Sequence, residues 1–253
     1  MKKNKIYILL TLMLMVTSCV PKKEIVYFQG AQNFNNSSSN YEPLIQNDDV
    51  LYINISAKQP KAAEPFNLDN LSLEGSSNSS FGVQKQTYLV DNFGNIDFPV
   101  IGTLSVAGFS VKGLKDLLKE RLAIYLKDPV INIRIMNFKV SILGEVLRPG
   151  TIIADSERIT LIEALAKAGD LTLYGKRDNI LVIRDFQGIK TFNRIDITKA
   201  DFVNSPFYYL DQNDVVYVEP RKSKIDSTAI GSNVTSIISI LGFALTTLFI
   251  IIK

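Results

Sequence analysis

The chain has 253 residues, with 28 basic and 25 acidic side chains, no histidine and a single cysteine. These counts exclude a disulfide within the chain and any Ser-His or Cys-His catalytic pair, and they remove most zinc, iron and copper sites. Residues 1–18 hold three lysines and no acid, so the remaining chain carries 25 residues of each sign. The composition therefore gives no clustered basic excess of the kind that nucleic acid requires.

Residues 1–18 are predicted to be a lipoprotein signal peptide. Three lysines lie at its start, and the uncharged core 6–16 is too short to span a bilayer as a helix. The sequence Val-Thr-Ser-Cys that ends at Cys19 resembles the bacterial lipobox, whose thiol accepts diacylglycerol. We predict that Cys19 is lipidated; the alternative is a generic signal peptide with an unrelated cysteine.

Residues 19–43 are predicted to be a polar tether, because most of this stretch has little to bury. Its apolar part, 24–30, is interpreted as a strand that packs on a neighbouring element. The first folded unit is predicted at 44–137, as an α+β domain with an inserted loop. Its expected elements are a strand at 50–55, a polar loop at 60–82, a hairpin at 88–102 that turns at Asn92 and Gly94, a helix at 111–127 with Ser110 as N-cap, and a strand at 130–138.

A second unit is predicted at 138–219 and follows without a linker. Two hairpins around one short helix predict a β-grasp fold. The expected elements are a strand at 139–146, a type II turn at Arg148-Pro149-Gly150, a strand at 151–154, a helix at 161–168 ended by Gly169, a hairpin that turns at Gln187-Gly188, and a last strand at 214–218.

One pentapeptide occurs in both units in similar form. Asp-Val-Leu-Tyr-Ile at 49–53 aligns without a gap with Asp-Val-Val-Tyr-Val at 214–218. The two stretches are interpreted as a turn aspartate followed by a buried strand, and a true duplication is the alternative.

Two longer runs carry a resemblance to a known family. The run 94–135 resembles the N-terminal domain of the outer-membrane polysaccharide export family. The motifs GEVLRPG and EALAKAG, with YYLDQNDVVYV, resemble its SLBB domain (soluble-ligand-binding β-grasp). The resemblance covers 44–219. It departs from the family in having Asp48 and Asn213 where glycine is usual, and one β-grasp domain where larger relatives have two.

The resemblance implies a lipoprotein that forms a ring, an octamer in the family, and exports capsular or extracellular polysaccharide through the outer membrane. It implies soluble domains in the periplasm and an inner-membrane co-polymerase, often with a tyrosine kinase, as partner. Polysaccharide and membrane lipid complete the expected partners. Nucleic acid, cofactors, metals and catalytic residues are not expected. C-terminal helices of the family form a barrel in the outer membrane.

The closing residues fit such a helix. After a linker at 220–232, residues 233–253 are predicted to be a transmembrane helix, because the uncharged run 234–252 would cover about 28 Å. Small and hydroxyl residues fall mostly on one side of this helix, and we expect them to face the pore or a helix–helix seam; a simple anchor is the alternative. This stripe comprises Ser232, Thr235, Ser236, Ser239, Gly242, Thr246 and Thr247.

Two other classes of function remain open. The first is a non-channel envelope lipoprotein that binds glycan or scaffolds a complex. The second is a glycosidase that works through paired carboxylates. The carboxylates considered for it lie beside predicted turns or caps, where aspartate is common for local reasons: Asp91, Asp97, Asp155, Asp170 and Asp178.

Overall fold

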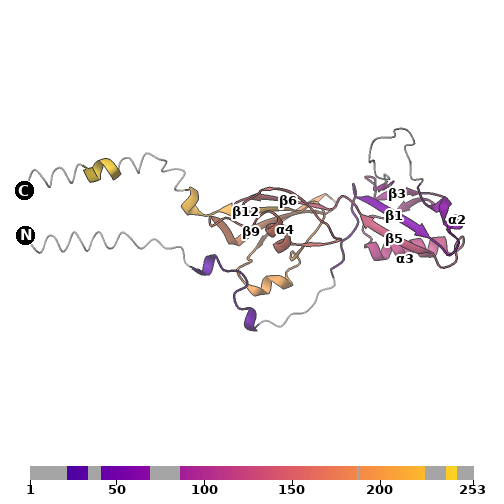
Figure 1. Ribbon diagram of the computed structural model, residues 1–253, viewed down its shortest axis with the longest axis horizontal. Helices are drawn as coiled ribbons and strands as arrows, with labels where there is room; N and C mark the ends of the chain where they lie inside the picture. The colour runs from indigo at the N-terminus through magenta and orange to yellow at the C-terminus, as the bar shows by residue number, and fades with distance from the viewer. Residues whose placement is uncertain (1–21, 34–40, 69–85, 187, 226–237, 244–253) are drawn as a thin grey trace, which may run out of the picture.

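The computed structural model describes residues 22–33, 41–68, 86–186, 188–225 and 238–243. Two domains lie end to end along the long axis of the molecule (Figure 1), and each has its own hydrophobic core. Ile133 is the last fully buried member of the first core, and Phe138 is the first of the second. The chain therefore passes from one core to the other within a few residues.

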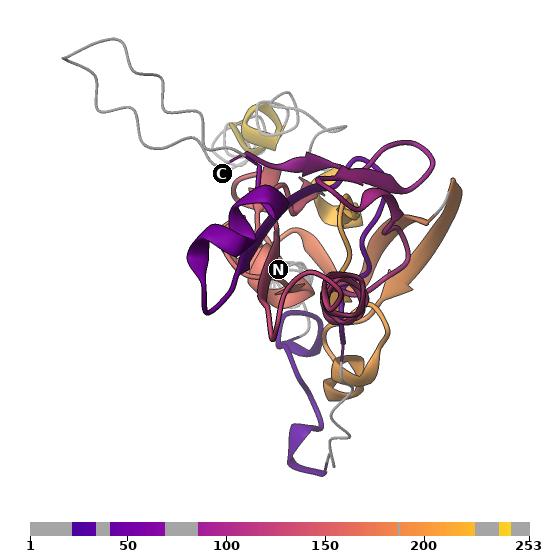
Figure 2. The same cartoon turned by 90° about the vertical axis from the view of Figure 1, so that its right-hand side faces the viewer.

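The first domain is a small antiparallel sheet covered by a helix (Figure 2, where this domain faces the viewer). Helix α3, at Val111–Leu122, buries Val111, Leu114, Leu118 and Leu122, which recur at intervals of three and four residues. The Ser110 hydroxyl accepts the Gly113 N–H at 3.1 Å, so the predicted start of the helix and its N-cap are confirmed, whereas the helix ends at Leu122 and not at 127 as predicted. The sheet order is β2-β1-β5. The elements are β1 Val50–Ser56, α2 Pro60–Ala63, β2 Tyr88–Leu89, β3 Asn95–Phe98, β4 Gly102–Ser105, α3 Val111–Leu122 and β5 Val130–Ile135.

Two predictions for this domain are wrong. Strand β2 does not form a hairpin with β3 across Asn92 and Gly94, because it pairs with β1, and β3 pairs instead with β4. The predicted loop at 60–82 begins with the short helix α2 and a 3-10 turn at Glu64–Phe66, which bury Ala63 and Phe66. The chain does turn at Gly94, which has φ of 80°, but the strands on either side of this turn pair with other strands.

The second domain is a five-stranded mixed sheet with one α-helix, α4 at Leu161–Lys167. Thr160 and Glu163 form a reciprocal capping box at the start of this helix, and Gly169, with φ of 81°, follows its end as predicted. The predicted hairpin at Gly188 and the last strand are confirmed. The strand order is β10-β9-β12-β6-β7. The elements are β6 Lys139–Gly144, β7 Gly150–Ile153, β8 Ile159–Thr160, α4 Leu161–Lys167, β9 Gly175–Phe186, β10 Ile189–Ile195, β11 Tyr209–Leu210 and β12 Val215–Pro220.

The first and last strands of this domain, β6 and β12, pair in parallel, and the other pairs in its sheet are antiparallel. Gly144 lies where they meet, with φ of 88°, and a Cβ there would overlap the carbonyl oxygen of Val218. Only glycine permits this approach. The type II turn predicted at Gly150 is wrong, because its φ of 159° is already extended and the residue begins β7.

Candidate functional site

The residues predicted from the sequence to act at the membrane lie mostly outside the part of the chain that the structure describes. Cys19 is among them, as are five members of the stripe: Ser232, Thr235, Ser236, Thr246 and Thr247. Ser239 and Gly242 are described, and both lie exposed in the helical segment 238–243. Within the described residues, no helix is both long and apolar enough to cross a membrane.

The segment predicted as a tether is in part docked on the second domain, so that prediction needs correction for residues 22–33. The Arg221 guanidinium donates to the Glu24 carboxylate and to the Glu24 carbonyl oxygen, each at 2.6 Å. Arg221 is 8% exposed, and its backbone N–H also donates to the Tyr174 carbonyl at 2.7 Å. The segment before the folded core and the segment after it therefore meet at one polar contact between Glu24 and Arg221, which is called the joint below.

The aromatic residues of the same segment extend this contact. Tyr27 donates its hydroxyl to Asp170 at 2.6 Å, and burial raises the pKa of this tyrosine. The Phe28 ring packs 5.7 Å from that of Phe202. Gln29 forms a single parallel bridge with Lys199, so the predicted strand is reduced to one bridge. No sequence signal pairs these residues with partners more than 140 positions away.

The joint lies at the end of the second domain that is farthest from the first domain. Figure 1 shows the indigo segment at 22–24 and the orange segment at 221–225 together at this end. Lys224 forms an ion pair with Glu145, and the hydrogen bond from Lys224 lowers the pKa of that carboxyl. The described segments nearest to the two predicted membrane attachments thus lie at the same end of the second domain.

The two edges of the five-stranded sheet are exposed. Strand β7 forms one edge and β10 the other. Ile153 on β7 and Phe192 on β10 are 66% and 65% exposed, although both are large apolar side chains. Each edge also has free backbone groups, which makes it able to pair with another chain.

The junction between the domains is polar. Asn137 lies between the last strand of the first domain and the first strand of the second. Its side chain accepts the Val50 N–H and donates to the Asp48 carbonyl, both at 2.9 Å. Its own carbonyl accepts from Gln212, whose amide oxygen also accepts the Lys139 N–H at 2.8 Å. One asparagine and one glutamine therefore link the backbones of both domains.

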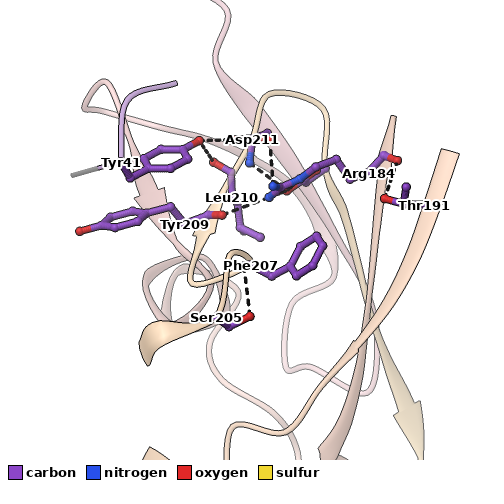
Figure 3. A network of polar contacts seen from close by, with 9 residues as sticks. Tyr41, Arg184, Thr191, Ser205, Phe207, Tyr209, Leu210 and Asp211 are labelled. Atoms are coloured by element: carbon purple, nitrogen blue, oxygen red, sulfur yellow. Dashed lines mark hydrogen bonds and ion pairs between the residues drawn. The ribbon is translucent and has the colours of Figure 1, made fainter. Parts of the chain in front are cut away.

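An arginine network in the second domain lies beside this junction (Figure 3). The Arg184 guanidinium donates to both carboxylate oxygens of Asp214 and forms an ion pair with Asp211 at 2.9 Å. Burial lowers the pKa of Arg184, but the bonds and charges of the two aspartates outweigh it and raise that pKa. Tyr41 donates to Asp211 and stacks on Tyr209, with ring centroids 4.7 Å apart and planes 11° from parallel.

A groove of about 740 Å³ opens next to this stack, between the two domains. One wall is the first turn of α3, and the other is the loop before α4 with Tyr208 and Tyr209. Residues 41–43 line it as well. No sequence pattern predicted this groove, because its walls come from four separate parts of the chain.

The aspartates considered for catalysis do not converge. Asp91 accepts backbone N–H groups of its own turn, Asp97 accepts the Thr103 hydroxyl, and Asp155 pairs with Lys167. Among the described residues no group of three or more acidic or cysteine side chains could hold a metal ion. These local bonds are the ordinary roles of aspartate near turns.

Comparison with known proteins gives matches over both domains. Residues 37–136 match the family described as polysaccharide biosynthesis/export protein, and residues 138–218 match the SLBB domain. The EPS I polysaccharide export outer membrane protein EpsA of Ralstonia solanacearum is 30% identical over 139 residues, which cover 53% of this chain and 36% of that protein. The EpsA protein of Ralstonia nicotianae is 34% identical over 101 residues, 38% of this chain and 26% of that protein.

The chain therefore spans about a third or less of the length of these curated relatives. The two family matches follow each other in the order, and at nearly the positions, of the two hydrophobic cores. The chain belongs to the polysaccharide export family and carries an SLBB domain.

Proposed function

We propose that this chain is an outer-membrane lipoprotein subunit of an oligomeric channel, which exports capsular or extracellular polysaccharide from the periplasm to the cell surface. The observation that carries the proposal is the joint between Glu24 and Arg221. Residue 24 follows Cys19 closely, and residue 221 precedes the apolar run 234–252 by a short linker. A lipid anchor and a membrane helix leaving one end of the molecule can enter the same bilayer.

This arrangement gives the molecule a direction. The second domain lies next to the membrane, and the first domain points away from it into the periplasm. That exposed far end is where an inner-membrane co-polymerase, with or without a tyrosine kinase, would contact the subunit. Family membership supports the polysaccharide as cargo, because the relatives are named polysaccharide export outer membrane proteins.

The two exposed sheet edges support a ring. A closed ring needs head-to-tail contacts, in which two different surfaces of the same subunit meet. Strands β7 and β10 are two such surfaces on opposite edges of one sheet, and each carries exposed apolar side chains. An octamer is the assembly that the family resemblance suggests.

The pore wall is assigned to residues 233–253. On this proposal the stripe with Ser239 and Thr246 faces water or a neighbouring helix, and Leu241 and Leu248 face lipid. Single cysteines at 239 and 246 are expected to react with a membrane-impermeant thiol reagent added to cells, and cysteines at 241 and 248 are not. Equal labelling of all four positions would indicate that no side of the helix is selectively exposed to water, and it would support a simple anchor.

Three experiments test the proposal as a whole. Particle images of the detergent-extracted protein are expected to show closed rings, and single subunits would favour the non-channel lipoprotein. Deletion of residues 233–253 is expected to stop export while the protein stays attached through Cys19. Cys19→Ser is expected to block lipidation and leave the precursor uncleaved, and normal maturation of this variant would contradict the lipid anchor.

A further inference from the structure

We propose that the groove between the two domains binds a short segment of saccharide chain. This inference rests on the proposed export function, since it assigns part of the cargo's contact surface to a defined site. The groove's volume of about 740 Å³ lies within the usual range of small-molecule sites, roughly 300 to 1,000 Å³. It is partly open to solvent, as a site for part of a longer chain must be.

Aromatic rings form one side of the groove. Tyr41 stacks on Tyr209, and Tyr208 meets Tyr209 edge-on, with centroids 5.0 Å apart and planes at 85°. Arg158 lies 5.2 Å above the Tyr209 ring. The hydroxyls of Tyr208 and Tyr209 have no hydrogen-bond partner among the described residues. Rigid, half-buried rings with available hydroxyls can pack against the apolar C–H face of a sugar and bond its hydroxyls.

Charged groups of both signs form the rest of the lining. Lys112 and Lys115 reach it from the first turn of α3, and neither forms an ion pair with a described residue. Glu42 and Glu157 reach it from the other walls, and they too lack a described cationic partner. Glu163 also lines the groove, but one of its oxygens is held in the capping box of α4.

This mixture favours a polyhydroxylated ligand over an anion. A phosphate or nucleic-acid site needs an excess of cations, whereas here three basic and three acidic side chains line the same groove. A sugar hydroxyl both donates and accepts, so it can bond a carboxylate with its hydrogen and an ammonium group with its oxygen. The aromatic rings then supply the apolar contact that orients the chain.

The test uses the detergent-solubilised full chain and oligomers prepared by partial hydrolysis of the surface polysaccharide of the cells that produce it. Calorimetric titration is expected to show binding, and the double variant Lys112→Ala/Lys115→Ala to weaken it about tenfold or more, since it loses two charged hydrogen-bond donors. Lys119→Ala/Lys127→Ala removes the same charge from exposed positions outside the groove, and its binding is expected to equal the wild type.

Absence of binding by the wild-type chain would overturn the inference, and so would equal loss in the two double variants. Tyr208→Phe provides a second measure, because it removes one groove hydroxyl while keeping the ring, and it is expected to weaken binding severalfold. The proposed function is tested separately by export in cells that lack the chain. Continued export in those cells would refute the channel. If export stops there but the purified chain does not bind the oligomers, only the groove is refuted.

Discussion

Asp49 in the first domain and Asp214 in the second occupy the same kind of turn, yet their carboxylates have different surroundings. They are 0% and 1% exposed, and each follows a residue with φ near 65°. Each accepts the backbone N–H three residues before it, at 2.9 and 2.8 Å. Asp214 is also held by Arg184, whereas Asp49 Oδ1 has no hydrogen-bond partner in the described structure. Burial raises the pKa of Asp49 to about 6, although the bond from Gln46 opposes the rise.

The comparison separates what a local sequence specifies from what the surrounding fold supplies. Asp48 and Asn213 both adopt the left-handed conformation, so the turns persist without the glycine that is usual in the family. The strands that follow have different neighbours: β1 lies between two antiparallel strands, and β12 lies between antiparallel β9 and parallel β6. The shared pentapeptide thus encodes a turn and a buried strand, and its charge partner comes from elsewhere in the chain.

Removing Arg184 should make the surroundings of Asp214 resemble those of Asp49, and this change should cause the largest loss in the free energy of unfolding. Arg184→Met leaves Asp214 buried without its partner, and we expect a loss of about 3 to 5 kcal/mol in the free energy of unfolding. Arg194→Met is the matched control, because Arg194 pairs with Glu219 with half of its side chain exposed, and it should cost about 1 kcal/mol or less. Urea unfolding measures the free energy of unfolding of both variants. Equal losses would refute the difference between a buried and an exposed ion pair.

Neutralising Asp49 should instead increase the free energy of unfolding. The folded state binds the Asp49 proton more tightly than the unfolded chain, so wild-type stability falls as the pH rises from about 4 to about 6 and then levels off. Asp49→Asn lacks this loss. We expect it to gain up to about 3 kcal/mol over wild type across that interval. Urea unfolding at pH 4, 5, 6 and 7.5 measures the gap, and a gap that does not grow with pH would contradict the raised pKa.

A smaller effect is expected for the tyrosine that completes the arginine network. Tyr41→Phe keeps the stack on Tyr209 but loses the hydroxyl's bonds to Asp211 and to the Leu210 carbonyl. We expect a loss of about 1 to 2 kcal/mol, because Asp211 retains its ion pair with Arg184. Tyr125→Phe serves as control, and a loss as large there would mean that the hydroxyl bonds contribute little.

The smallest effect is expected where a buried arginine has a partly exposed partner. The Glu24 side chain is 49% exposed, so water can replace part of its contact with Arg221. Glu24→Gln should cost about 1 kcal/mol and keep the carbonyl bond from the same guanidinium. The measurable consequence is faster trypsin cleavage at Lys22 and Lys23. Unchanged cleavage would indicate that the aromatic contacts alone hold this segment.

Local signals in the sequence predicted much of the fold. The spacing of leucines and the serine cap predicted α3, and Gly169 and Gly188 marked a helix end and a hairpin turn. The pairing of β2 with β1 was missed, because those residues are almost 40 positions apart and the nearer turn suggested a different partner. Alternation of side chains identifies strands, but it does not say which strand lies beside which.

The candidate site was less predictable for the same reason. The groove joins residues near 42, 112, 157 and 208, and the joint at Arg221 connects the two ends of the folded part. Each of these contacts depends on the complete topology and has no sequence motif of its own. The predicted membrane residues, by contrast, came from a lipobox motif and from the pattern of an apolar run, so they remain predictions wherever the structure does not describe them.

The parallel pairing of β6 with β12 has a mechanical consequence. The chain enters β6 from the first domain at Lys139, and it leaves β12 at Pro220 at the opposite end. Tension between the first domain and the C-terminal segment would pull these neighbouring strands in opposite directions along their lengths. The hydrogen bonds between them would then be loaded together in shear and could not open one after another. A second domain connected in this way can transmit force along the molecule without unzipping.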